Sequence, residues 1–303
     1  MKIIDGHVHL VEKIAGFCRR GELRAIGDGK ARWANGDIMK LIPRGYGDKD
    51  FTGEALIRLM DDNDIEKAVL MQGSLYGFQN EYTYEMCSKY PNRFVGACTI
   101  DPFAENYNEV LDRFINKLGF KILKLEVSSG GGLMGYHYKF FLDGEEMKNI
   151  WHKVSENDMV MVLDIGDFTM ESYQPEAIRN MALKYPNLKI VVCHLTAPRV
   201  GMEDRLKKTL ELLKLPNIWF DLAALPSINA PDKYPYPNAL NAIKIAKNIV
   251  GTDKLIWGTD APMTAALDEY SNLVSYLKDA KLFNERELED IFYNNALRVY
   301  FNY

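Results

Sequence analysis

Residues 184–195 read KYPNLKIVVCHL, and the pattern of this stretch recurs along the chain. The proline ends a preceding helix, the apolar and β-branched run that follows is typical of a buried strand, and a polar side chain comes where the run ends. Seven other stretches carry a similar apolar run. The eight predicted strands are residues 2–8, 66–72, 94–100, 120–127, 159–164, 188–193, 217–222 and 254–259.

Stretches with helical spacing alternate with these runs. The predicted helices are residues 53–64, 80–90, 105–118, 143–157, 171–185, 202–215, 238–250, 268–280 and 284–301. Strict alternation of strands and helices predicts a parallel sheet of the α/β class, and eight units in about 300 residues favour one (β/α)₈ TIM-barrel domain. An open, doubly wound sheet is the alternative. We expect residues 11–50, between the first strand and the first helix, to be an extended loop insertion over the barrel mouth.

The composition is that of an ordinary globular protein and narrows the choice of partners. Of the 303 residues, 47% are hydrophobic and 26% are charged, and the net charge is −5. This mild acidity argues against a nucleic-acid partner, and no apolar run is long enough to span a membrane. No apolar signal segment follows Met1, so we expect a cytoplasmic protein that acts on a small molecule. The sequence does not fix the oligomeric state, and a homo-oligomer is one of the alternatives.

The four cysteines form no CxxC pair and are interpreted as buried, reduced thiols. Cys193 directly precedes His194, which raises the question of a cysteine–histidine nucleophile. Neighbouring side chains on one strand point to opposite faces, so we expect these two side chains not to meet.

Two alternating histidines, His7 and His9, are the sharpest chemical feature of the sequence. A spacing of two places both imidazoles on one face of the first predicted strand, at its carboxyl end. His194 and Asp260 close the sixth and eighth predicted strands, and carboxyl ends of barrel strands supply the catalytic groups of TIM-barrel enzymes. Neutral imidazole is the commonest ligand of transition metals, so these residues predict a metal site.

The motifs IIDGHVH, KYPNLKIVVCHL and WGTDAP, in this order, resemble the amidohydrolase superfamily. The similarity is greatest to its amidohydrolase 2 branch, which includes the relatives of aminocarboxymuconate-semialdehyde decarboxylase. The resemblance implies a (β/α)₈ barrel with one or two divalent metal ions, usually zinc. It implies that His7 and His9 are metal ligands, that His194 is a ligand or a catalytic acid–base, and that Asp260 binds metal or moves a proton.

The sequence departs from this family on two strands. Asp164 stands at the end of strand five, where the family usually has a metal-binding histidine, and an oxygen ligand there would accommodate manganese as well as zinc. Glu126 ends strand four and is a further candidate ligand. Lys124 lies two residues before Glu126 on the same face, so these two side chains form either a plain ion pair or part of the site.

Substrate contacts are predicted from the segments around the mouth. Gly130–Gly135 formally matches a dinucleotide-binding motif, but no helix follows directly, so we interpret it as a mobile loop. Tyr136 and His137 follow this loop and are candidate substrate contacts, together with Lys124. Arg44 is one of several arginines that are candidates to bind a substrate carboxylate.

These residues favour a metal-dependent hydrolase acting on an amide, lactone or ester of a small carboxylated molecule. In this hypothesis the ion activates water, Asp260 accepts its proton, and His194 stabilises the oxyanion or protonates the leaving group. The nearest alternative is a nonoxidative decarboxylase with the same metal site. Metal-free lactone hydrolysis, a non-catalytic small-molecule-binding barrel and an NAD-dependent oxidoreductase are more distant alternatives.

Overall fold

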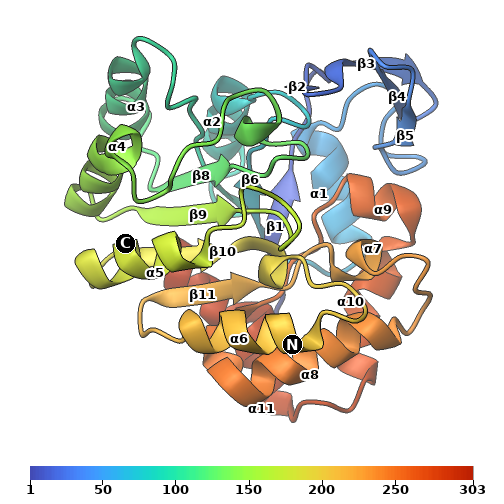
Figure 1. Cartoon of the computed structure of the whole chain (residues 1–303). Coiled ribbons are helices and arrows are strands. Elements are labelled where there is room, and N and C mark those ends of the chain that lie inside the picture. Colours follow the sequence, from blue (N-terminus) through green and yellow to red (C-terminus); the bar gives the residue numbers. More distant parts are fainter. Residues whose placement is uncertain (303) are drawn as a thin grey trace.

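The computed structural model describes residues 1–302, and its centre is a set of eight parallel strands surrounded by helices (Figure 1). Each strand lies within or overlaps one of the runs predicted from the sequence. The eight strands are β1 (Ile4–His9), β6 (Lys67–Met71), β7 (Phe94–Gly96), β8 (Ile122–Glu126), β9 (Val160–Asp164), β10 (Lys189–Val192), β11 (Ile218–Asp221) and β12 (Leu255–Ile256).

The strands pair as two arcs, in the orders β1-β6-β7 and β12-β11-β10-β9-β8. Backbone hydrogen bonds join the arcs at both seams. At one seam the N–H of Cys98 donates to the carbonyl of Ile122, at 2.9 Å. At the other, Gly6 donates to Trp257 at 3.0 Å and His9 donates to Ala261 at 2.7 Å. The arcs therefore close into a ring, and the predicted TIM barrel is confirmed.

The helices follow the strands as predicted, each burying an apolar face. In α1, for example, Leu56, Leu59 and Met60 are buried, and the side chain of Thr52 caps the amino end. The main helices are α1 (Gly53–Asp61), α2 (Asn80–Lys89), α3 (Tyr107–Asn116), α4 (Glu145–Glu156), α5 (Pro175–Lys184), α6 (Glu203–Leu212), α8 (Pro237–Val250), α10 (Tyr270–Asp279) and α11 (Glu285–Glu289). None of the helices within residues 1–302 has the length and apolar character needed to cross a bilayer.

Shorter segments cover the two ends of the barrel. α7 (Leu225–Ile228) and α9 (Met263–Leu267) follow the carboxyl ends of β11 and β12. After α11 the chain continues in π-helical turns, and Ala296 and Val299 share one buried cluster with the interior residues Ile4 and Val191. This C-terminal segment therefore closes the amino-terminal end of the barrel, and the opposite end is left for the site.

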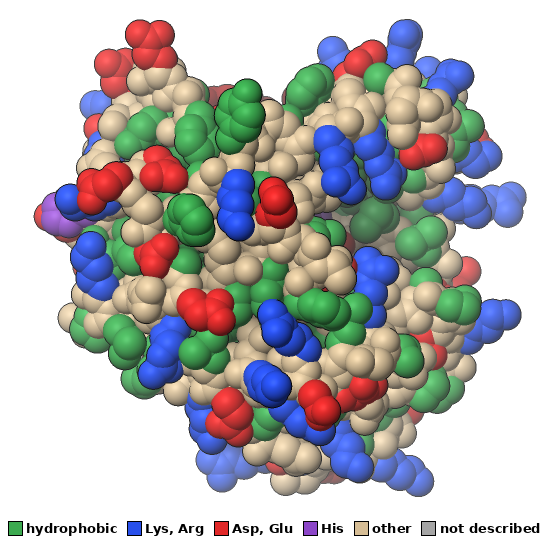
Figure 2. Space-filling view, in the orientation of Figure 1, with side chains coloured by type: hydrophobic (Ala, Val, Ile, Leu, Met, Phe, Trp, Pro, Cys, Tyr) green, Lys and Arg blue, Asp and Glu red, His purple; other side chains and the backbone are tan. Residues whose placement is uncertain are grey.

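Residues 11–50, the expected extended loop insertion, contain regular secondary structure. They contain an antiparallel sheet of β2 (Phe17–Cys18), β3 (Gly21–Gly27), β4 (Lys30–Trp33) and β5 (Ile38–Lys40). The two-residue turn between β3 and β4 is Asp28-Gly29, with both φ angles positive (55° and 66°), as a type I′ hairpin requires. Lys and Arg side chains gather over this sheet (Figure 2).

The seam between the first and last strands depends on glycine and on one buried carboxylate. A Cβ atom at Gly6 would lie 2.6 Å from the side chain of Ile256, so only glycine allows this approach. Asp5 is fully buried beside it. Its carboxylate accepts hydrogen bonds from the backbone N–H of Thr259 (2.9 Å), the hydroxyl of Thr259 (2.5 Å) and the hydroxyl of Tyr270 (2.7 Å).

We predict that Tyr270→Phe destabilises the protein by about 2 kcal/mol at pH 8, because it removes a hydrogen bond to a buried charged acceptor. Burial raises the pKa of Asp5 to about 6, although the donors around it favour the ionised form. Asp5 is therefore ionised at pH 8 and largely protonated at pH 5, and the loss should be smaller at pH 5. Urea unfolding at the two pH values measures both effects.

Tyr276→Phe is the matched control, since Tyr276 is equally buried but has no hydrogen bond to Asp5. A change below about 0.5 kcal/mol is expected for it. Equal losses for the two variants would contradict the role assigned to the Asp5 contact.

Candidate metal centre

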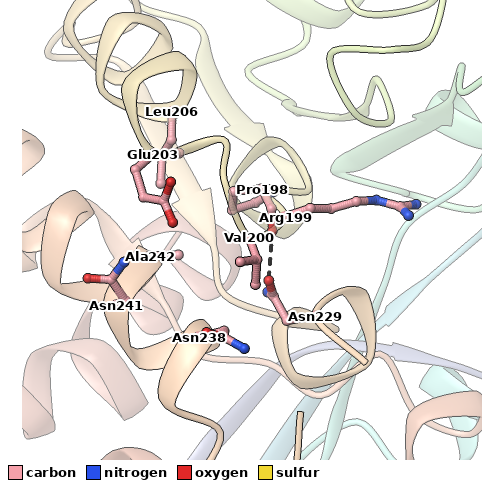
Figure 3. Close-up of a pocket in the computed structure, with 9 residues that line it drawn as sticks. All are labelled: Pro198, Arg199, Val200, Glu203, Leu206, Asn229, Asn238, Asn241 and Ala242. Atoms are coloured by element: carbon pink, nitrogen blue, oxygen red, sulfur yellow. Dashed lines mark hydrogen bonds between the residues drawn. The ribbon is translucent and has the colours of Figure 1, made fainter. Parts of the chain in front are cut away.

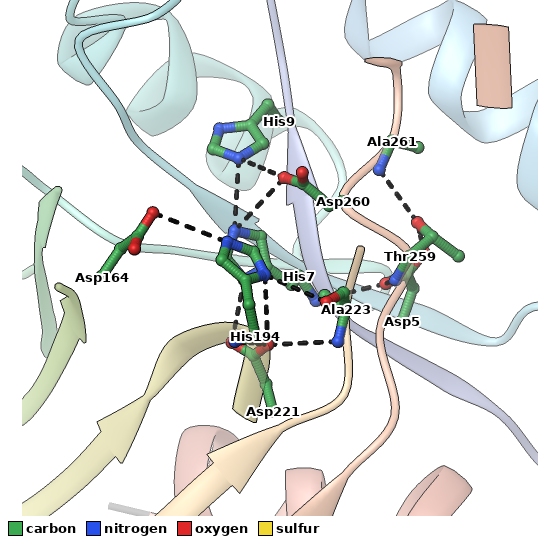
Figure 4. A network of polar contacts seen from close by, with 10 residues as sticks. All are labelled: Asp5, His7, His9, Asp164, His194, Asp221, Ala223, Thr259, Asp260 and Ala261. Carbon is green, nitrogen blue, oxygen red and sulfur yellow. Dashed lines mark hydrogen bonds and ion pairs between the residues drawn. The ribbon is translucent and has the colours of Figure 1, made fainter. Parts of the chain in front are cut away.

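The side chains of His7 and His9, from β1, and of Asp260, from the segment after β12, converge where the first and last strands meet (Figure 4). His7 Nε2 lies 3.2 Å from His9 Nε2. Asp260 Oδ1 lies 3.0 Å from His9 Nε2 and 3.6 Å from His7 Nε2. A backbone hydrogen bond places Asp260 beside the two histidines: the N–H of Asp260 donates to the carbonyl of His7 at 2.8 Å. A shift of register between Asp5 and Val8 lets both imidazoles face the barrel interior.

Burial keeps both imidazoles in the form that binds metal. Desolvation lowers the pKa of His7 below its ordinary value, against the opposing influence of Asp221. Desolvation lowers the pKa of His9 to about 4, against its hydrogen bond to Asp260. The pKa of Asp260 is lowered, because its interactions with the neighbouring histidines outweigh the cost of burial. At neutral pH the site therefore offers two neutral imidazoles and one carboxylate.

This donor set fits a divalent transition-metal ion. Two ring nitrogens, each about 2.05 Å from a tetrahedral zinc ion, are about 3.3 Å apart. The observed separation of His7 Nε2 and His9 Nε2 is 3.2 Å. The donor atoms of His7, His9 and Asp260 all lie within 4.8 Å of one another. A second such group, which shares His7, consists of His7, Cys193 and His194.

The second group shows that the expectation for Cys193 and His194 is wrong. Strand alternation ends at Val192, because His194, Leu195, Thr196 and Ala197 all have positive φ angles between 50° and 63°. This left-handed turn brings His194 back over the barrel mouth, beside the interior-facing Cys193. The ring centroids of His194 and His7 are 4.9 Å apart. Left-handed backbone costs about 1–2 kcal/mol per non-glycine residue, so the turn is strained.

Asp164 and Glu126 lie at adjacent strand ends but outside both groups of converging donors among the described residues. Asp164 Oδ2 faces His194 Nε2 at 3.7 Å, so its nearest charged partner is His194 and not the His7–His9 pair. The carboxylate of Glu126 lies against Gly73 and Gly131, whose missing side chains make room for it. Both carboxylates line the same cavity as His9 and Asp260, and their assignment as metal ligands stays a prediction.

One cavity of about 390 Å³ joins these groups. Its wall includes His9, His194, Asp164, Glu126 and Asp260, together with Lys124 from the middle of β8. Lys124 is 2% exposed, and no hydrogen bond or ion pair joins its ammonium group to a described residue. Burial lowers its pKa, but the surrounding thiol and carboxylates more than compensate and raise it, so the lysine is charged.

The other predicted substrate contacts lie elsewhere. The hydroxyl of Tyr136 lies 3.5 Å from Ser74, and His137 pairs with Asp101 at 2.8 Å. Neither residue lines the cavity of Lys124, and a short 3₁₀ segment (Leu133–Gly135) separates both from Gly130 and Gly131, which do line it. Arg44 lines a different cavity, beside α9 and α10. Of the predicted substrate contacts, only Lys124 lies in the cavity.

The structure adds residues that the sequence analysis did not single out. Asp221, at the end of β11, is fully buried and contacts His7 and His194. The run NIWFDL carries the signal used for His194 and Asp260, a polar residue at the end of an apolar run, and would have identified it. Asp167 pairs with Arg199 at 3.3 Å on the cavity wall.

A second, very small cavity lies behind Arg199, between α6 and α8 (Figure 3). Its volume of about 20 Å³ is enough for one water molecule. The side chain of Arg199 extends away from this cavity in Figure 3, and it also lines the large one. The chemistry of the site is therefore concentrated in the cavity at the barrel mouth.

Comparison with known proteins gives the same fold across the chain. The amidohydrolase family model matches residues 4–301. No curated protein sequence matches the chain significantly. Two solved structures are aligned over 99% of both chains. One is a probable 2-pyrone-4,6-dicarboxylic acid hydrolase from Acinetobacter baumannii with citric acid bound (20% identity, TM-score 0.69), and the other an amidohydrolase from Burkholderia multivorans with bound zinc (15%, 0.73).

A third similar structure is a 2,6-dihydroxybenzoate decarboxylase from Rhizobium, with 16% identity and a TM-score of 0.60. The alignment covers 80% of this chain and 86% of that one. At these identities the likeness describes the barrel and its elements.

We predict that His7→Ala, His9→Ala and Asp260→Asn each abolish stable metal binding, because each removes one of three converging donors. After loading with Zn²⁺ or Mn²⁺ and desalting, elemental analysis should find about one equivalent in the unaltered protein and below about 0.2 in each variant. His152→Ala is the control, since His152 pairs with Glu156 on the exposed face of α4. Metal content that survives all three substitutions would refute this donor set.

Proposed function

The chain belongs to the amidohydrolase family, and on that basis we propose that it is a metal-dependent hydrolase of small carboxylated lactones, esters or amides. One observation carries the proposal. The cavity at the barrel mouth brings the His9–Asp260 contact, the ring of His194 and the buried ammonium group of Lys124 into one space of about 390 Å³. That volume is in the range of small-molecule sites.

His7, His9 and Asp260 are the residues that would hold the ion. A divalent ion held there supplies Lewis-acid polarisation of a carbonyl and acidification of a water molecule. Asp260 contacts both imidazoles through Oδ1, which leaves Oδ2 free. We assign to Asp260 the acceptance of the proton that the attacking water loses, with Oδ2 as the receiving atom.

His194 is assigned the opposite proton transfer. Burial opposes its charge, but the carboxylates of Asp221, Asp164 and Asp260 outweigh burial and raise the pKa of His194 above its ordinary value. Its Nδ1 is directed at the carbonyl of Ala223, at 3.1 Å, so Nε2 is the ring atom left for the cavity. A protonated His194 would stabilise the developing oxyanion and donate its Nε2 proton to the leaving oxygen or nitrogen.

Lys124 and Arg199 support an anionic substrate. The ammonium group of Lys124 is buried and makes no direct hydrogen bond or ion pair with a described residue, so its N–H groups are assigned to a substrate carboxylate. Arg199 lies on the wall of the same cavity and is suited to a second carboxylate. Met170, Met263 and Leu267 supply apolar wall for a ring between the two charges. A lactone with two carboxylates, as in the name of the Acinetobacter structure, meets these demands.

A nonoxidative decarboxylase is the second candidate. The barrel of the Rhizobium 2,6-dihydroxybenzoate decarboxylase favours it, since the same donor set and a carboxylate held at Lys124 would also suit loss of CO₂ from an aromatic acid. In that reaction His194 or Asp260 would deliver a proton to carbon.

We predict that the metal-loaded protein, presented with carboxylated lactones and with carboxylated phenols, turns over the lactones. In H₂¹⁸O, mass spectrometry should find one ¹⁸O atom in the newly formed carboxylate, because water attacks the carbonyl. CO₂ release from the phenols without ¹⁸O incorporation would replace hydrolysis with decarboxylation. No turnover of either class would favour a binding protein.

We predict that Lys124→Met raises KM for a carboxylated lactone at least about tenfold, since a charge-assisted contact is worth about 1.5–3 kcal/mol. The methyl ester of the same lactone should show a much smaller change, because it lacks the anion. Lys121→Met is the matched control: Lys121 donates to the carbonyl of Asn157 and lies outside the cavity lining. Equal effects on acid and ester would refute recognition of the carboxylate by Lys124.

A further inference from the structure

Two histidines of the site have their inner ring nitrogens held by the end of a single strand. His7 Nδ1 lies 3.0 Å from Asp221 Oδ2, and His194 Nδ1 lies 3.1 Å from the carbonyl oxygen of Ala223. Asp221 ends β11, and Ala223 follows two residues later. The centroids of the two rings are 4.9 Å apart, and the rings overlap in the view of Figure 4, with Asp221 below them and His9 and Asp260 above.

Both contacts prescribe which ring nitrogen carries the proton. A carbonyl oxygen only accepts, so Nδ1 of His194 must be the donor. A carboxylate at neutral pH also only accepts, so Asp221 Oδ2 accepts from His7 Nδ1. In the neutral rings the proton is therefore on Nδ1, and the lone pair is on Nε2.

We propose that the end of β11 is the element that sets the tautomers of His7 and His194, with Asp221 as a positioning residue. The lone pair of His7 Nε2 is then directed at His9 and Asp260. His194 Nε2 is directed at Asp164 and the cavity. The functional role of these tautomers rests on the proposed metal site. The tautomers themselves are a property of the metal-free chain and can be observed without an ion.

Asp221 also holds the backbone that carries His194. Its Oδ1 accepts from the backbone N–H of His194 at 2.8 Å and from the backbone N–H of Ala223 at 3.2 Å. The first contact ties the start of the left-handed turn to β11. One buried carboxylate thus orients the ring of His7 through Oδ2 and the backbone of His194 through Oδ1.

These contacts make Asp221→Asn a directed test, because they fix how the new amide must lie. Two backbone N–H groups face the Oδ1 position, so the amide oxygen takes that place and the NH₂ group faces His7 Nδ1. An amide NH₂ donates, so His7 must now accept at Nδ1 and carry its proton on Nε2. His194 keeps its proton on Nδ1, because the carbonyl of Ala223 is unchanged.

The experiment is long-range ¹H–¹⁵N NMR of ¹⁵N-histidine-labelled, metal-free protein, followed by Zn²⁺ titration. The unaltered protein should show His7 and His194 with Nδ1–H, and Asp221→Asn should reverse His7 alone. Zn²⁺ affinity should fall about 10- to 100-fold, as expected when the partner of a ligating histidine is changed. The thermal unfolding temperature of the metal-free variant should stay close to that of the parent.

Asp167→Asn is the control for loss of a buried negative charge near the site. Asp167 is also buried but binds Thr169 and Arg199 and no histidine. It should leave both tautomers and the Zn²⁺ affinity unchanged. An Nε2–H tautomer of His7 or His194 in the unaltered metal-free protein overturns the proposal even if Asp221→Asn does not fold, as does an unreversed His7 in a folded variant. Absence of Zn²⁺ binding by the unaltered protein, with the tautomers as stated, would refute only the proposed metal site.

Discussion

The contact between β1 and the segment after β12 determines the rest of the site. Donation from His9 to Ala261 and from Asp260 to His7 sets the first and last strand ends at one level. The seam is narrow: Gly6 has no room for a side chain, and a Cβ atom at Gly258 would lie 2.9 Å from the backbone nitrogen of His7. Side chains some 250 residues apart in sequence, such as those of His9 and Asp260, therefore meet as a result of ring closure. A chain whose barrel has not closed has no donor set, so formation of the site and completion of the fold are one event.

Around this seam, buried polar groups are matched pair by pair. Asp221 is matched by His7 and two backbone donors, Asp260 by His9, and Asp5 by Thr259 and Tyr270. Lys124 departs from this matching, because no described residue pairs with its ammonium group. Lys124 lies in the cavity where a ligand would enter. Side chains that reduce stability are expected at functional sites.

Much of this arrangement was predictable from the sequence, because it depends on patterns among residues that are close together in the chain. Apolar runs and helical spacing fix the order of the barrel elements, and the alternation of His7 and His9 fixes their shared face. Features that depend on backbone conformation were not predictable in the same way. The left-handed turn at His194 reverses the expectation for Cys193, and no residue type in that turn announces it. The approach of Asp164 to His194 depends on that same turn, so it was not predictable from the sequence. The hairpin at Asp28-Gly29 does carry a local signal, because Asp-Gly between two strands is typical of a type I′ turn.

The left-handed turn has a consequence for the evolution of this chain. Each of its four residues is held in a backbone region that side chains disfavour, so replacing Leu195 with glycine would relieve about 1–2 kcal/mol of backbone strain. Leu195 is also fully buried in the core, and loss of its side chain would cost about 2–5 kcal/mol. Packing of Leu195 therefore outweighs the strain of the turn, and selection for stability would retain a bulky apolar residue at this position.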